Sequence, residues 1–222
     1  MPIDDGELTP PGGLGVVAWT VAMAYLKARS AIQAMPAGLR DLPTGCLVLS
    51  ADTACELDGR ILGKPADQAH ARAMLQAMQG TTHAVATGVA LVHPGRPTTH
   101  RLLLVDVAHV RIEALPPATL EAYLASGQWQ GKAGGYNLHD RLREGWPITV
   151  HGDPDTVVGL PAAALPGWLA QAASWAHGSD EPGSPDEHEP AATPAIGDRH
   201  NAHALPQARP DGHGQARKDG PR

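Results

Sequence analysis

Three groups of residues in this sequence have side chains and a spacing that suit them to act on phosphate groups. A carboxylate, Asp52, follows an apolar run, and two lysines, Lys64 and Lys132, lie in glycine-containing segments. A pair of glycines, Gly134-Gly135, comes shortly after the second lysine. Hydrolysis of a triphosphate needs a carboxylate that holds a divalent metal or activates water, cations for the phosphates, and backbone that a ligand can approach closely. These residues could supply all three.

Each of these residues alone also has a simpler structural explanation. An aspartate at the end of a strand is more often a turn or cap residue, and a lysine beside a proline is usually only solvated. The segment Gly59–Pro65 resembles a phosphate-binding P-loop, but it is one residue short. It also has Pro65 where the Ser or Thr that binds the metal should be, so we reject the P-loop.

The strands that must position the aspartate are indicated by apolar runs. Residues 46–50 (CLVLS) have the length and composition of a strand that is covered on both faces. We predict that this strand ends at residues 51–53 (Ala-Asp-Thr), because polar side chains at the end of such a strand are well placed to reach a cleft. Two further β-rich runs, 84–92 and 101–112, are predicted to form a hairpin-like pair.

Helices are predicted around these strands, so the sequence indicates an α/β fold. Residues 67–79 have the clearest helical pattern, with Asp67 at the start, apolar side chains at helical spacing, and Gly80 as the stop. Further helices are predicted over residues 16–33, from about 116 to 124, and from about 162 to 176.

Length and composition favour one folded domain with a tail. The chain has 222 residues, of which 42% are hydrophobic, and a formal net charge of −6. This acidic balance argues against a nucleic-acid-binding surface, whereas an enzyme for anionic nucleotides can still be acidic overall. We expect a loose leader over residues 1–15, a folded domain over 16–177, and a disordered, proline-rich tail over 178–222.

The cellular compartment is indicated by the lack of a membrane-spanning or secretory segment in the sequence. No apolar stretch approaches the roughly 18 residues that a spanning helix needs, and the N-terminus is acidic and rich in Pro and Gly. We therefore expect a cytoplasmic protein without membrane contact. Cys46 and Cys55 are then expected to be small buried hydrophobes rather than a disulfide or a metal pair.

The order of four sequence blocks resembles that of a known family, although no single residue is enough to indicate it. The blocks are, in order, ADTxxxxDGRILGKP, GTTHAVATGVALV, GQWQGKAGGY and GDPDTVVGLP. From about Leu47 to Pro161 they closely resemble the Maf family of nucleotide pyrophosphatases. The stretch VAMAYLKARSAI also resembles the family's helix before the aspartate strand.

The resemblance implies a fold and an activity. The implied fold is Maf/ITPase-like: an elongated mixed sheet flanked by helices, with a cleft between two lobes. The implied activity is hydrolysis of a nucleoside triphosphate to the monophosphate and pyrophosphate with a divalent cation, Mg²⁺ or Mn²⁺, as part of house-cleaning of the nucleotide pool. The general motif style, with Thr53, leans towards dTTP or UTP as substrate. A homodimer is compatible with the resemblance.

The same resemblance implies roles for individual residues. Asp52 would be the proton acceptor or the metal-linked carboxylate, and Thr53 would sit at a substrate-selecting position. Lys64 and Lys132 would face the phosphates. Many family members have Gln where His139 is aligned, and that Gln helps to read the base. His139 is therefore a candidate base contact with a different hydrogen-bonding pattern, or else a loop residue that faces solvent.

One departure from the family pattern lies at the N-terminus and affects the expected rate of catalysis. The family usually opens with a strand and a Ser-x-Ser-Pro-Arg-Arg segment whose Arg meets the phosphates, and neither occurs in this sequence. Either the reading frame is truncated or part of the site has been lost. Both explanations predict weaker catalysis, because charge-assisted contacts to the phosphates would be missing. A catalytically impaired nucleotide-binding or regulatory protein on the same fold is thus the alternative to an active enzyme.

Overall fold

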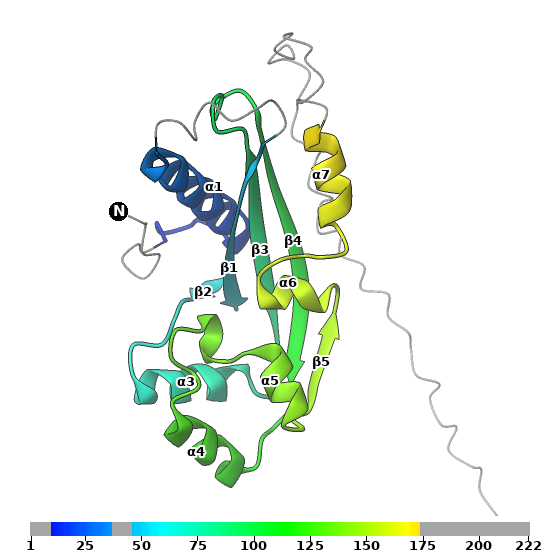
Figure 1. Ribbon diagram of the computed structural model, residues 1–222. Coiled ribbons are helices and arrows are strands. Elements are labelled where there is room, and N and C mark those ends of the chain that lie inside the picture. Colours follow the sequence, from blue (N-terminus) through cyan, green and yellow to red (C-terminus); the bar gives the residue numbers. More distant parts are fainter. Residues whose placement is uncertain (1–9, 37–45, 174–222) are drawn as a thin grey trace, which may run out of the picture. The chain divides into compact units, whose positions relative to one another are not determined.

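The chain folds around a single five-stranded sheet in the computed structural model, which describes residues 10–36 and 46–173 (Figure 1). The strands are β1 (Val48–Leu57), β2 (Arg60–Leu62), β3 (Thr82–Val92), β4 (Arg101–Ile112) and β5 (Ile148–His151), in the order β2-β1-β3-β4-β5. The helices are α1 (Val16–Ala34), α3 (Gln68–Met78), α4 (Pro117–Ser126), α5 (Leu138–Arg143), α6 (Pro154–Val158) and α7 (Leu165–Ala173), with a short 3₁₀ turn, η2 (Ala133–Gly135).

The α/β class, with helices flanking a sheet, is confirmed, but the strand directions differ from the mixed sheet that was expected. Every pair of named strands is antiparallel. Among the described residues, parallel pairing is confined to an isolated bridge between Gln79 and Ile112. Connection length explains two of these pairs, because the turn at Asp58-Gly59 between β1 and β2 and the loop 93–100 between β3 and β4 are too short for the crossover that parallel neighbours need.

Some of the expected regions fall outside the part of the chain that is described. The predicted tail, 178–222, lies wholly outside the described residues, as does most of the leader, 1–15. Among the helices that are described, none combines the length and the apolarity needed to cross a bilayer.

Helix α3 forms where the sequence predicts it, and for the predicted reasons. The Asp67 side chain caps the helix by accepting a hydrogen bond of 2.7 Å from the His70 backbone N–H. Four apolar side chains at helical spacing are buried against the core: Ala71, Met74, Leu75 and Met78. The predicted helix over 16–33 is likewise confirmed as α1.

Strand β1 is longer than predicted, so Asp52 does not lie at a strand end. The strand continues to Leu57, and its register with β3 pairs Asp52 with Gly88 and Thr53 with Thr87. Pairing with β3 extends to Glu56, which keeps the polar Asp52 and Thr53 inside the ladder. The sequence rule failed because strand length is set by the available partner strand as well as by local polarity.

The two faces of β3 pack against different helices. Ala86, Ala90 and Val92 lie in the clusters that α1 covers, whereas Val89 and Leu91 lie with α7, as the alternation of side chains along a strand requires. A larger cluster gathers at one end of the sheet, around α3, α4 and two tryptophans. The buried side chains thus divide between one end of the sheet and the rest of it.

Gly88 allows α1 to lie directly on the sheet. A β-carbon at this position would come within 2.4 Å of the carbonyl carbon of Thr20 and 2.5 Å of the backbone nitrogen of Val21. Thr20 is fully buried there, and its hydroxyl donates back to the Val16 carbonyl at 3.0 Å. Gly88 is therefore the residue at which the helix backbone and the sheet backbone meet.

A buried polar pair lies at the start of β3. His83 is 1% exposed, and its Nε2 lies 2.8 Å from the hydroxyl of Tyr136, with the two rings packed edge to face. Burial lowers the pKa of His83 to about 4 and raises the pKa of Tyr136 well above its usual value. His83 is accordingly neutral in the folded protein at pH 7.

Adding a methyl group at Gly88 tests the close approach. We expect Gly88→Ala to lower the free energy of unfolding by at least about 2 kcal/mol, because the α1 backbone must move away from the sheet. Urea unfolding measures this loss. The matched control is Gly167→Ala in α7, where an added β-carbon meets no atom within 4 Å. A Gly88→Ala protein as stable as the control would contradict the packing described here.

The buried His83 predicts a loss of stability in acid. Its folded pKa of about 4 is below the ordinary value of 6.5, so the unfolded chain binds the extra proton first, and stability falls as the pH drops from about 6.5 to about 4. Between about pH 7.5 and about pH 5, the wild type should lose about 2 kcal/mol more than His83→Gln in urea unfolding. Equal losses in the two proteins would show that His83 is not buried in its neutral form.

Candidate functional site

A hollow of about 340 Å³ lies at the edge of the sheet, where β1 runs past the end of β2. The short β2 pairs only with residues 55–57 of β1, so along residues 48–54 no described strand covers this edge. Side chains from α1, β1, the segment 131–137 and the end of α6 line the hollow. We call it the edge pocket.

An ion pair joins α1 to β1 at one wall of the edge pocket. The Lys27 ammonium lies 2.7 Å from Oδ1 of Asp52, and Asp52 is only 6% exposed. Asp52 and Gly88 are direct partners across the ladder, so both face α1. The close approach of α1 at Gly88 therefore brings Lys27 within reach of the carboxylate.

Thr53 points to the opposite face of the sheet, because successive side chains of a strand alternate. Its hydroxyl oxygen lies 2.7 Å from that of Thr87, and Thr87 donates to the Thr156 carbonyl at 2.6 Å. The Thr156 hydroxyl in turn donates to the Asp106 carboxylate. Gly159, which ends α6, lies over Thr53, where an added β-carbon would be 3.4 Å from the threonine oxygen.

The two loops that carry the lysines of the edge pocket are bonded to each other. The Gly134 N–H donates to the Gly63 carbonyl at 3.1 Å, which joins the loop after β2 to the loop of Lys132. Gly134 has a left-handed backbone, and a side chain there would also press on the Cys55 sulfur at 3.0 Å. The Lys132 ammonium itself donates to the Gln128 carbonyl at 2.5 Å.

Charge and size suit the edge pocket to a polyanion. Its lining residues include three lysines, Lys27, Lys64 and Lys132, against a single carboxylate, Asp52. Its volume lies near the lower end of the range of roughly 300–1,000 Å³ that small-molecule sites occupy. Cys55, Val85 and Tyr136 provide a less polar part of the wall. Burial raises the pKa of Cys55 to about 12, so this thiol stays protonated.

A divalent metal would find one protein ligand in the edge pocket. In the described parts of the chain, no group of three or more His, Cys, Asp or Glu side chains could hold a metal ion. Mg²⁺ in phosphate-transfer sites is usually held by one or two carboxylates together with phosphate oxygens and water. Asp52 therefore fits a cation that is bound jointly with a phosphorylated ligand, and does not fit a cation held by protein alone.

Four of the five site residues predicted from the sequence meet in the edge pocket. Asp52, Thr53, Lys64 and Lys132 all line it. His139, on the first turn of α5, does not, whereas Asn137 from the same segment does. Asn137 also caps α5 by accepting a hydrogen bond from the Asp140 N–H at 3.1 Å.

Lys27 is a site residue that sequence reasoning missed. The signal was its place in α1: it lies on the stripe of buried residues that includes Thr20, Ala24 and Ala28. A lysine on an otherwise small and apolar helix face needs an acceptor beneath it. Periodicity alone did not show that this acceptor is Asp52.

Comparison with known proteins identifies relatives of the chain. A family profile described as Maf-like protein matches residues 14–172. The dTTP/UTP pyrophosphatase of Salinibacter ruber is 46% identical over 119 residues, which cover 54% of this chain and 57% of that protein. The dTTP/UTP pyrophosphatase of Pelotomaculum thermopropionicum is 37% identical over 161 residues, which cover 71% of this chain and 76% of that protein.

A third relative, the dTTP/UTP pyrophosphatase of an Anaeromyxobacter species, is 41% identical over 145 residues, covering 64% of this chain and 68% of that protein. The chain thus spans little more than half the length of the Salinibacter relative. The family profile, in contrast, extends over most of the chain and includes every residue that lines the edge pocket. The chain belongs to the Maf-like protein family.

Proposed function

We propose that this protein hydrolyses nucleoside triphosphates to the monophosphate and pyrophosphate in the edge pocket, with dTTP and UTP as preferred substrates. The observation that carries the proposal is the meeting of one buried carboxylate, Asp52, with three lysines around a single hollow. The preference rests on the names of the three relatives, each a dTTP/UTP pyrophosphatase. Removal of damaged or surplus nucleotides from the pool, in the cytoplasm, is the role that this activity would serve.

In the proposed reaction, water attacks the α-phosphorus and the bond from that phosphorus to the bridging oxygen breaks. Asp52 accepts a proton from the attacking water, and pyrophosphate leaves with the bridging oxygen. Lys64 and Lys132 neutralise the charge that gathers on the phosphate oxygens, an effect that is strongest in a partly closed site. Lys27 acts on Asp52, since its ammonium holds the carboxylate in place at 2.7 Å.

A divalent cation would complete the proposed site together with the bound substrate. Asp52 would hold Mg²⁺ or Mn²⁺ together with phosphate oxygens, and the cation would supply Lewis-acid polarisation of the phosphoryl groups. The protein's own contribution is to fix the carboxylate, through β1 and Lys27, and to place the lysines around the remaining negative charge.

The base would lie towards the less polar wall of the edge pocket. Tyr136 belongs to this wall, Asn137 lines the pocket next to it in the chain, and Thr53 would act as the substrate-selecting residue. His139 was predicted to read the base, and it lies on α5 outside the lining residues. Asn137, whose amide carries both a donor and an acceptor, is the better placed member of the segment.

A nucleotide panel tests the activity and the substrate preference. With Mg²⁺ or Mn²⁺ present, we expect pyrophosphate release to be fastest with dTTP and UTP, slower with the other triphosphates, and abolished by a chelator. The release of pyrophosphate, rather than orthophosphate, distinguishes cleavage at the α-phosphorus. Binding of dTTP by calorimetry without any turnover would instead favour the catalytically impaired, nucleotide-binding alternative.

Replacing the carboxylate tests the role of Asp52. We expect Asp52→Asn to lower kcat by about a thousandfold, because an amide neither accepts the proton nor carries charge. The fold should persist with reduced stability, since Lys27 loses its ion-pair partner but is partly exposed to water. The matched control is Asp58→Asn, in the turn after β1, which should keep full activity. Turnover by Asp52→Asn at the rate of the control would rule out the assignment.

A further inference from the structure

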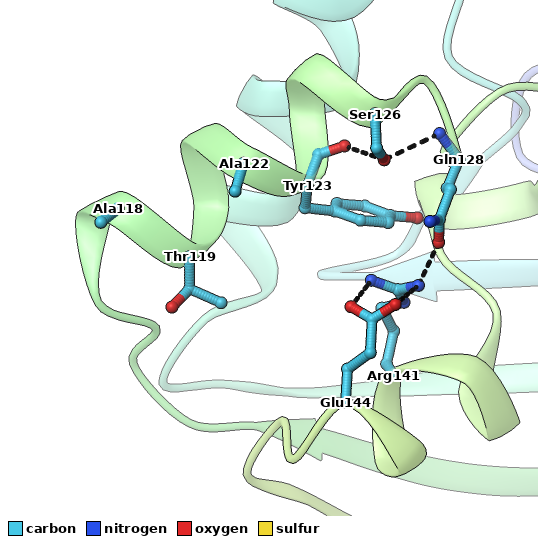
Figure 2. A pocket seen from close by; sticks show the side chains of 8 residues that line it. All are labelled: Ala118, Thr119, Ala122, Tyr123, Ser126, Gln128, Arg141 and Glu144. Carbon is cyan, nitrogen blue, oxygen red and sulfur yellow. Dashed lines mark hydrogen bonds and ion pairs between the residues drawn. The ribbon is translucent and has the colours of Figure 1, made fainter.

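A buried arginine, Arg141, lines a second hollow between α4 and α5 (Figure 2). Arg141 is 1% exposed, although a guanidinium is among the groups most costly to remove from water. Its two terminal nitrogens bond both carboxylate oxygens of Glu144, at 2.6 and 2.9 Å. One of them also donates to Oε1 of Gln128.

The bond to Gln128 connects Arg141 to Lys132. The backbone carbonyl of Gln128 accepts from the Lys132 ammonium at 2.5 Å, while its side chain accepts from Arg141. Its N–H donates to Oγ of Ser126 at 3.2 Å, and Ser126 donates to the Tyr123 carbonyl at 2.7 Å (Figure 2). Gln128 is therefore held at its side chain and at its N–H, and its carbonyl is presented to the lysine.

A second route runs from Arg141 to the other end of the same loop. The guanidinium carbon lies 4.3 Å from the centre of the Tyr123 ring, a stacking distance for cation–π contact. The Tyr123 hydroxyl donates to the Gly135 carbonyl at 2.8 Å. Arg141 thus supports the segment 128–135, which carries Lys132, at both of its ends.

Stability alone is a weak explanation for this arrangement. A buried ion pair often stabilises a fold no better than apolar side chains of similar volume. The half-exposed Glu144 neutralises Arg141, so the guanidinium is poorly suited to binding an anion itself. What the guanidinium provides, and an apolar side chain cannot, is a planar fork that reaches Glu144 and Gln128 together while stacking on Tyr123.

We propose that Arg141 is a positioning residue for Lys132, acting through Gln128 and Tyr123. A lysine ammonium has three hydrogens, so the bond to the Gln128 carbonyl leaves two for phosphate oxygens. The carbonyl holds the ammonium at the rim of the edge pocket before substrate arrives. This inference rests on the proposed function, because it assumes that Lys132 meets the phosphates.

A double-mutant cycle tests the route from Arg141 to Lys132. Arg141→Lys keeps the charge but loses the planar fork, and we expect it to lower kcat/KM by about tenfold through misplacement of Lys132. In a Lys132→Gln background the same substitution should have almost no further effect, because the group it positions is gone. Independent, multiplying losses in the two backgrounds would overturn the proposal, as would unchanged kcat/KM in Arg141→Lys alone.

Two further variants separate positioning from general loss of stability. Gln128→Ala keeps the carbonyl that meets Lys132 but frees it from Arg141, so it should reproduce the loss in kcat/KM even if Arg141→Lys folds poorly. Arg72→Lys is the matched control, because Arg72 makes the same forked pair with Glu121 on the exposed surface between α3 and α4. It should leave kcat/KM unchanged, and an equal loss in this control would overturn the proposal.

Hydrogen exchange gives a readout that does not depend on activity. In Arg141→Lys and Gln128→Ala, the backbone amides of residues 129–135 should exchange faster than in the wild type, including the Gly134 amide that bonds to Gly63. In Arg72→Lys they should not. Faster exchange in a protein that turns over no nucleotide would support the positioning role while rejecting the proposed function. Unchanged exchange would overturn the positioning role whatever the activity.

Discussion

The backbone of α1 lies so close to Gly88 that no side chain fits between the helix and β3. This approach sets the height of the whole helix above the sheet, and Lys27 lies two turns beyond the point of contact at Thr20. Gly88 is also the cross-strand partner of Asp52. The contact that brings α1 close to the sheet therefore lies directly beside the carboxylate that pairs with Lys27 of this helix. Packing and site geometry are thus determined at the same place.

The other side of the edge pocket depends on backbone conformation in a similar way. Gly134 has a left-handed backbone, a side chain added there would press on Cys55 of β1, and its N–H donates to the Gly63 carbonyl. Two loops distant in sequence are thereby held against one strand. Because each of these loops carries a lysine, their mutual bond fixes the spacing of positive charge around the carboxylate, which solvent-exposed lysines on independent loops would not achieve.

Local features of the structure could be predicted from the sequence, and features that depend on distant pairing could not. Helix α3 follows from a capping aspartate and from apolar spacing, both contained within the segment itself. The end of β1 was misplaced because its length depends on the register with β3. Asp52 and Lys132 were predicted from the sequence and both line the edge pocket, whereas the place of Lys27 beside them depends on the packing of α1 at Gly88. His139 was placed by alignment alone, and alignment does not show which way a helix turns its side chains.

The hydrogen bonds that link the hydroxyl of Thr53 to Thr87, and Thr87 to Thr156, run in one fixed direction. A carbonyl oxygen can only accept, so the bond from Thr87 to Thr156 uses the single hydrogen of Thr87. Thr53 must then give its own hydrogen to Thr87, 2.7 Å away. The Thr53 oxygen therefore presents only lone pairs to the edge pocket. A ligand atom can bond to it only by donating a hydrogen. The imide N–H of a pyrimidine, a sugar hydroxyl or a water molecule satisfies this condition, whereas a phosphate oxygen or a bare ring nitrogen meets only repulsion there.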